Sequence, residues 1–281
     1  TTAQRALIRE LVEAARPILE AGGHAVDPNL ERIREMLTRE IRERRLEEFI
    51  ARENIIIKTT AASGRRDGSI RYWLSSGPGS LDLMPAAGAE PGFFVMIFPG
   101  LVYPDSFKTT GVRVMTTTYP IKPPLYAITK TTNYLPNVLM QMEAKEAGFD
   151  NGVFIDHDGH VGESSNMNVA FVSKDGVLVH PKFDHILSGC TSMRLIELAP
   201  KLVAKGLIKD VKVAHVTLDA ALAANEMLLI GSSVKVAGIV QWDSHTIGNG
   251  KPGPVAAALL HLLDEDMRTG DRLTDVPYSD A

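Results

Sequence analysis

Residues 162–172 read Gly-Glu-Ser-Ser-Asn-Met-Asn-Val-Ala-Phe-Val, a β-rich apolar run that follows a turn of small hydroxylated residues. Two later segments have the same character, Leu-Ser-Gly-Cys-Thr at residues 187–191 and Gly-Ser-Ser at residues 231–233. The last two are typical of phosphate cradles, because glycine lets the backbone approach an anion and hydroxyls donate hydrogen bonds to it. Alone, each is weak evidence, because a Gly-Ser-Ser segment is usually an ordinary turn.

Hydrophobic periodicity around these segments predicts an α/β chain of two domains, 1–108 and 109–281. The first ~55 residues are helical in pattern, and a Pro-rich run at 119–124 is typical of a passage between domains. Leu135, Val138, Leu139 and Met142 predict a helix that ends at Gly148, and a second helix is expected to open at Thr191. The predicted strands are 54–60 paired with 69–74 as a hairpin, then 93–98, 112–118, 153–155, 168–172 and 227–230.

Composition excludes several classes of protein. The 281 residues are 44% hydrophobic and carry a formal net charge of −4, so no basic field favours nucleic acid. The longest apolar stretches, such as 93–98 and 255–260, are too short to cross a membrane. We expect a cytoplasmic location, because Cys190 is the single cysteine and residues 1–5 lack the apolar core of a secretory signal; an organelle-targeting segment already removed is the alternative.

Motifs for other chemistries are missing from the sequence. The eight histidines show no His-Glu-x-x-His spacing and Cys190 has no CxxC partner, so we expect no metal site. Hydrolase and nucleotide-binding motifs do not occur either. Lys130 stands out instead, because it lies between the apolar residues 125–128 and the helix expected near Pro136. Its amine is expected to be partly desolvated, which favours a nucleophile, although a surface lysine at a strand end is the commoner case.

Taken together, residues 130–139 (Lys-Thr-Thr-Asn-Tyr-Leu-Pro-Asn-Val-Leu), 163–169 and 187–191 resemble class IV, or fold-type-IV, aminotransferases in order and spacing. Segments 133–139, 186–191 and 198–202 resemble the plant-type D-amino-acid aminotransferases of this family. The resemblance covers residues ~55–278. It implies a small N-terminal α/β domain, a larger C-terminal domain with a β-barrel-like core, pyridoxal 5′-phosphate as cofactor, and a homodimer.

The resemblance also implies roles for individual residues. Lys130 would form the Schiff base with the cofactor aldehyde and shuttle the substrate proton, and Glu163 would hydrogen-bond the pyridine nitrogen. Leu187 would pack against the ring and Tyr134 would reach its O3′ hydroxyl. The remaining candidates are phosphate donors and a carboxylate-binding arginine: Arg32, Cys190, Thr191, Ser232 and Ser233 for the phosphate, and Arg71 for the substrate.

The chain departs from the family pattern at its N-terminal end and at one later position. The family's Asp-Arg-Gly and Gly-Asp-Gly-like segments do not occur, and residues 1–26 look helical instead. Lys235 stands where many relatives have an acid. The resemblance therefore implies transfer of an amino group from an amino acid, most simply a D-amino acid, to a 2-oxoacid. Three alternatives stay open: aminodeoxychorismate lyase, branched-chain L-amino-acid aminotransferase, and a non-catalytic homologue.

Overall fold

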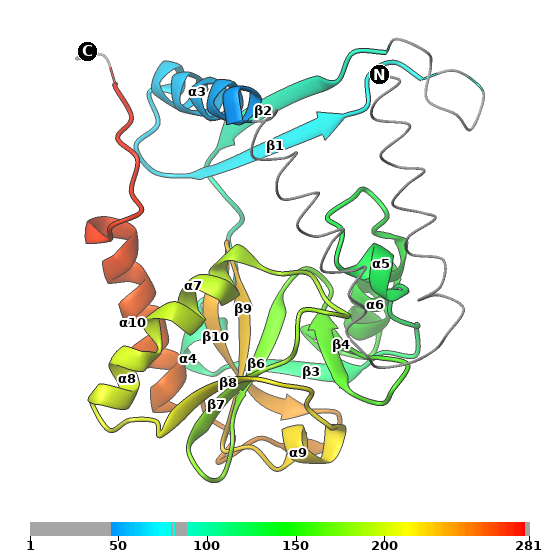
Figure 1. Ribbon diagram of the computed structural model, residues 1–281. Helices are drawn as coiled ribbons and strands as arrows, with labels where there is room; N and C mark the ends of the chain where they lie inside the picture. Colours follow the sequence, from blue (N-terminus) through cyan, green and yellow to red (C-terminus); the bar gives the residue numbers. More distant parts are fainter. Residues whose placement is uncertain (1–45, 80, 82–88, 279–281) are drawn as a thin grey trace, which may run out of the picture. The chain divides into compact units, whose positions relative to one another are not determined.

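The computed structural model describes residues 46–79, 81 and 89–278 (Figure 1). These residues form two compact units, one of residues 46–100 with 275–278 and one of residues 101–274. The helices expected in residues 1–45 lie outside the described residues, as does Arg32. The predicted division into domains 1–108 and 109–281 stays a prediction.

The first unit contains one helix and one hairpin. Helix α3 spans Leu46–Ser63, and strands β1 (Ser69–Ser75) and β2 (Gly92–Phe98) pair antiparallel from Ser69↔Phe98 to Ser75↔Gly92. The strand predicted over residues 54–60, and its hairpin with 69–74, are therefore wrong. The run of β-branched residues that suggested a strand is accommodated in the helix, where the hydroxyls of Thr59 and Thr60 donate to the carbonyls of Ile55 and Ile56 one turn earlier.

The second unit is built around a mixed sheet that curls into a half-barrel (Figure 1). Its strand order is β5-β4-β3-β10-β9-β6-β7-β8, and the short β11 pairs with β10. The pairs β10–β3, β3–β4 and β7–β8 are parallel, and the others are antiparallel. The strands are β3 (Val112–Thr116), β4 (Asn151–Ile155), β5 (Val161–Ser164), β6 (Asn168–Val172), β7 (Val177–His180), β8 (Asp210–Val213), β9 (Glu226–Gly231), β10 (Lys235–Trp242) and β11 (His245–Thr246).

Helices pack against this sheet and flank its ends. Helix α10 packs against β9, β10 and α7, and α8 packs against α7 and β8 (Figure 1). The predicted helices at 135–148 and from Thr191 are confirmed, and Pro200 separates α7 from α8. The helices are α4 (Ser106–Thr109), α5 (Pro124–Ala127), α6 (Leu135–Glu146), α7 (Cys190–Leu198), α8 (Pro200–Ala204), α9 (Leu218–Leu222) and α10 (Pro254–Thr269).

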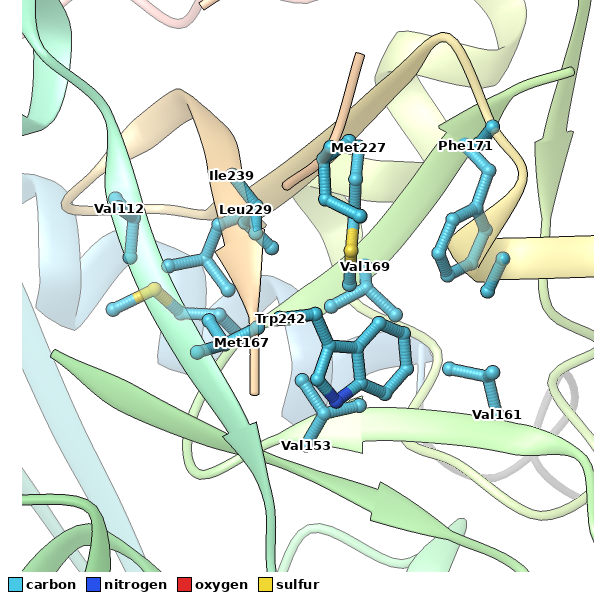
Figure 2. Packing of buried hydrophobic residues seen from close by; sticks show 14 of the residues in the cluster. Val112, Val153, Val161, Met167, Val169, Phe171, Met227, Leu229, Ile239 and Trp242 are labelled. Atoms are coloured by element: carbon cyan, nitrogen blue, oxygen red, sulfur yellow. The ribbon is translucent and has the colours of Figure 1, made fainter. Parts of the chain in front are cut away.

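Both faces of the central strands are buried, which explains why their sequences are apolar without alternation. Along β9, Met227 and Leu229 join one core cluster, whereas Leu228 and Ile230 join the cluster beneath α7, α8 and α10. Figure 2 shows the first cluster gathered around Trp242, whose ring nitrogen donates to the Thr116 hydroxyl at 2.9 Å. The sheet therefore provides a rigid frame, and the candidate residues lie on the turns at its edge.

Buried Glu226 fixes the start of α10. Its two carboxylate oxygens accept hydrogen bonds from the backbone N–H groups of Val255 and Ala256, each at 3.0 Å. This side chain caps a helix that has no cap from its own N-terminal residue. Gly253 is required beside it, because a Cβ there would lie 2.0 Å from the Glu226 Cδ. Among the described residues no helix combines the length and hydrophobicity that a membrane span requires.

Candidate active site

Lys130 lies in the segment between α5 and α6. Its Nζ donates a hydrogen bond to the Tyr134 hydroxyl at 3.1 Å, and Tyr134 directly precedes α6. Lys130 is exposed, so the expected desolvation of its amine is wrong for the residues that the structure describes. The amine is therefore oriented by the tyrosine and not by a dry pocket.

A second lysine near this pair was not singled out from the sequence. Lys122 is buried, and its Nζ lies 5.1 Å from the centre of the Tyr134 ring, against 5.7 Å for the Nζ of Lys130. Cations above an aromatic face are attracted to its electron density. Lys122 lies inside the Pro-rich run that suggested a passage between domains, and its only signal was Ile121 beside it, which is also buried.

Glu163 is a buried acid with one satisfied and one open oxygen. Its Oε2 accepts hydrogen bonds from the Asn168 side-chain amide and from the Leu187 backbone N–H, both at 3.2 Å. Within the described part of the chain, Oε1 accepts none. Burial raises the pKa of Glu163 to about 7, against the lowering effects of the Leu187 N–H and of the charges on Lys122 and Lys130. Such a carboxyl group is suited to accept a proton shared with a basic ring nitrogen.

One hydrogen bond joins the lysine segment to the glutamate strand. The side-chain amide of Asn137, in the first turn of α6, donates to the Ser165 carbonyl at 2.6 Å. The Ser165 hydroxyl in turn bonds Asn151 on β4, and the Ser164 hydroxyl bonds the Gly152 carbonyl. The conspicuous polar residues of 133–137 and 163–166 thus lie together because they hold α6 against β4 and β5.

Asn168 links Glu163 to the start of α7, a role that the sequence did not reveal. Its side-chain amide donates to the Leu187 carbonyl at 3.0 Å as well as to Glu163. Gly189 passes so close that a Cβ there would lie 2.0 Å from the Asn168 Oδ1. The glycine is therefore required by this close approach, and the amide fixes the path of the backbone from Leu187 into the helix.

The N-terminus of α7 offers backbone donors to an anion. Gly189 precedes the helix and supplies no side-chain cap to the first-turn N–H groups, which include those of Cys190 and Thr191. The Ser192 hydroxyl is buried without a hydrogen-bond partner among the described residues. These donors and the helix dipole favour a negative group at this end of α7.

The Gly231–Ser233 turn lies at the same edge of the sheet. Strands β6 and β9 pair with Asn168 opposite Ile230, so the turn that follows β9 begins one residue beyond the partner of Asn168. Ser232 and Ser233 are exposed there. Lys235, which has a φ of 63°, pairs with Asp264 on α10.

Arg71 belongs to the first unit. It lies on β1, is exposed, and its guanidinium lies 5.8 Å from the centre of the Trp73 ring. Its expected role at a substrate carboxylate stays a prediction.

The donor set fits pyridoxal 5′-phosphate. Glu163 offers an open carboxyl oxygen to a basic ring nitrogen, the uncapped start of α7 offers N–H groups to a phosphate, and Lys130 offers an accessible primary amine to an aldehyde. Register and hydrogen bonds bring the first two of these groups to one edge of the sheet.

Comparisons with known proteins agree with this chemistry. The family model described as amino-transferase class IV matches residues 30–242. The D-amino-acid transaminase, chloroplastic, of Arabidopsis thaliana is 48% identical over 219 residues, which are 78% of this chain and 58% of that protein. The D-alanine aminotransferase of Bacillus licheniformis is 29% identical over 203 residues, 72% of this chain and 69% of that protein. The chain thus spans less than two thirds of the plant relative.

A solved structure supports the same assignment. A branched-chain amino acid aminotransferase complexed with N-(5′-phosphopyridoxyl)-L-glutamate, from the source abbreviated T.th., superposes with a TM-score of 0.68 at 27% identity, over 77% of this chain and 70% of that chain. The half-barrel second unit is accordingly the cofactor-binding architecture of fold type IV. The chain belongs to the class IV aminotransferase family, whose cofactor is pyridoxal 5′-phosphate.

Proposed function

We propose that the protein is an aminotransferase that moves an amino group from a D-amino acid to a 2-oxoacid with pyridoxal 5′-phosphate. The observation that carries the proposal is Glu163, a buried carboxyl group with one open oxygen, beside the uncapped N-terminus of α7. The choice of a D-amino donor rests on the 48% identity to the plant D-amino-acid transaminase.

In this proposal each group of the chain has one task. Lys130 holds the cofactor through its Nζ and then carries the proton that leaves the substrate Cα, while the Tyr134 hydroxyl keeps that Nζ in position. Glu163 accepts a hydrogen bond from the ring nitrogen and keeps it protonated. When bound, the cofactor supplies the electron sink that makes the Cα proton acidic.

Binding and orientation fall to the neighbouring residues. The N–H groups at Cys190 and Thr191, with Ser232, Ser233 and Arg32, hold the phosphate, and Leu187 packs against the ring. Arg71 grips the substrate carboxylate through its two-pronged guanidinium. We also propose a homodimer, which light scattering tests: a stable, active species of 30.6 kDa contradicts it.

The test measures turnover of D- and L-alanine, glutamate and leucine, with and without 2-oxoglutarate or pyruvate. The proposal predicts turnover of the D-isomers that requires the 2-oxoacid. A preference for L-leucine would instead favour the reaction of the branched-chain structural neighbour. Pyruvate release from aminodeoxychorismate without any acceptor would favour the lyase. A protein that binds the cofactor and turns over none of these substrates would be a non-catalytic homologue.

A further inference from the structure

Three histidines and a buried aspartate come together at the turn between β4 and β5. Asp156 directly follows β4, and His160 lies four residues later, just before β5. His185 comes from the segment that leads to Leu187, and His215 from the segment between β8 and α9. No local motif reveals this cluster, because its members belong to three separate parts of the chain.

Asp156 is held firmly in its ionised form. Its Oδ1 accepts the backbone N–H groups of Asp158 at 2.9 Å and His160 at 2.8 Å, and its Oδ2 lies 3.0 Å from the His185 Nδ1. Burial alone would raise the pKa of Asp156, but the hydrogen bonds from His185 and the two backbone groups outweigh it and hold the pKa below its usual value. A carboxylate fixed in this way is a ready metal ligand.

His160 directs an unused nitrogen toward this carboxylate. Its Nδ1 is buried, has no hydrogen-bond partner among the described residues, and lies 3.7 Å from the Asp156 Oδ1. The His160 and His215 rings stack, with centroids 4.6 Å apart. One ligand atom from each of Asp156, His160 and His215 lies within 4.8 Å of the others. A buried nitrogen without a partner is costly in a folded protein, which suggests that something binds it.

We propose that Asp156, His160 and His215 bind one divalent transition-metal ion of the zinc type, with His185 orienting Asp156 from behind. Two imidazoles and a carboxylate suit zinc, whereas magnesium and calcium prefer shells made of oxygen. Ligand atoms in a zinc tetrahedron are about 3.3 Å apart, so small ring rotations would close the site. His215 is exposed, which leaves the fourth position to water.

Such an ion would clamp three segments of the chain, two of which are already joined by backbone contacts. Val161 N–H donates to the Val216 carbonyl at 2.8 Å, and His160 pairs with Thr217 in an isolated bridge. Through His185 the clamp would reach Leu187, whose N–H donates to Glu163. The ion would therefore stabilise the edge of the sheet near the cofactor site without taking part in the reaction.

The test titrates Zn²⁺ into the chelator-treated holoenzyme by calorimetry, with the metal content of the dialysed complex measured by mass spectrometry. We expect one ion per chain. The variants His160→Ala and His215→Ala should each weaken binding by at least about tenfold, because each removes a ligand. His215 is exposed, so its truncation leaves the core intact. The matched control is His157→Ala, an exposed histidine of the same turn outside the cluster, which should bind Zn²⁺ as the wild type does.

Substitution of Co²⁺ provides an independent readout, because a tetrahedral site with nitrogen and oxygen ligands gives a visible absorption band. The band should be present in the wild type and in His157→Ala and lost in His215→Ala. Absence of saturable binding would overturn the proposal. So would binding that survives both His160→Ala and His215→Ala, since the ion would then be held elsewhere. None of these outcomes depends on turnover, so they leave the proposed aminotransferase activity to its own test.

Discussion

Two buried acids seven residues apart, Asp156 and Glu163, end in opposite electrostatic states. Asp156 receives hydrogen bonds at both of its oxygens, and its pKa is lowered. Glu163 receives both of its hydrogen bonds at one oxygen, and its pKa is raised to about 7. Both side chains are similarly buried, so the number and placement of donors decides the outcome.

This difference separates a structural carboxylate from one that awaits a ligand. Glu226 supports the distinction, because both of its oxygens are used by the N–H groups at the start of α10. A buried acid with an unused oxygen costs stability, and proteins keep such groups where function requires them. The predictions below ask whether the open oxygen of Glu163 and the amine of Lys130 belong to one site.

The largest expected effect follows removal of the amine. Lys130→Ala should lower turnover by roughly 10³-fold or more, because the proton carrier and the anchor are lost together. Steady-state kinetics with a D-amino donor and a 2-oxoacid measures it. The control is Lys174→Ala, an exposed lysine in the β6–β7 turn, which should keep the wild-type rate. Near-normal turnover in Lys130→Ala would remove this residue from the site.

The stability of the cofactor-free protein should show the strain at Glu163. Its pKa is about 7 in the fold against an ordinary 4.5, so between these values the folded state holds a proton that the unfolded state has lost. Stability should therefore fall as pH rises from 4.5 to 7, by about 3 kcal/mol for this group. Unfolding by denaturant at several pH values measures the trend.

Two variants serve as controls for that trend. Glu163→Gln should lack the fall between pH 4.5 and 7. Asp156 should contribute in the opposite sense, with stability that is present above its ordinary pKa of 3.8 and lost as pH falls through its lowered folded value. Asp156→Asn should therefore keep the trend assigned to Glu163. An identical pH profile for the wild type and Glu163→Gln would contradict the raised pKa.

A smaller effect is expected on the chemical step. Glu163→Gln should bind the cofactor yet lower kcat by roughly 10- to 100-fold, because a hydrogen bond to a charged group contributes about 1.5–3 kcal/mol. Single-turnover measurement of Cα–H removal isolates this step. Glu226→Gln is the matched control, since it changes a buried acid that takes no part in the site. Unchanged Cα–H removal in Glu163→Gln would dismiss the proposed role.

The smallest effect concerns Glu226 itself. Glu226→Ala should lower the free energy of unfolding by about 1–2 kcal/mol, because the N–H groups of Val255 and Ala256 lose their acceptor. Thermal unfolding measures the loss. Turnover per folded molecule should stay unchanged, and a large drop in kcat would show that the start of α10 matters to the site.

Elements with strong periodicity could be predicted from the sequence. The predicted strand at 168–172 is confirmed residue for residue, and the predicted helix at 135–148 was right to within two residues. The segment 54–60 was wrong, because β-branched residues favour strands locally, whereas α3 accommodates them by bonding the threonine hydroxyls to its own carbonyls.

The candidate site was predictable where its residues form a motif and not where they meet only in space. Lys130, Glu163 and the 187–191 segment lie on conspicuous stretches of sequence. Lys122, Asn168 and the histidine cluster were missed, because each depends on which segments the fold brings together. The chemical roles of all the candidate residues stay predictions until they are tested.

The central claim is that Lys130 anchors the cofactor, and its competitor is Lys122, the buried lysine beside the same tyrosine ring. The most direct test reduces the holoenzyme with borohydride, digests it, and locates the phosphopyridoxyl group by mass spectrometry. We predict the added mass on Lys130 in one copy per chain, with Lys122 unmodified. The added mass on Lys122, or on any other lysine, would contradict the account.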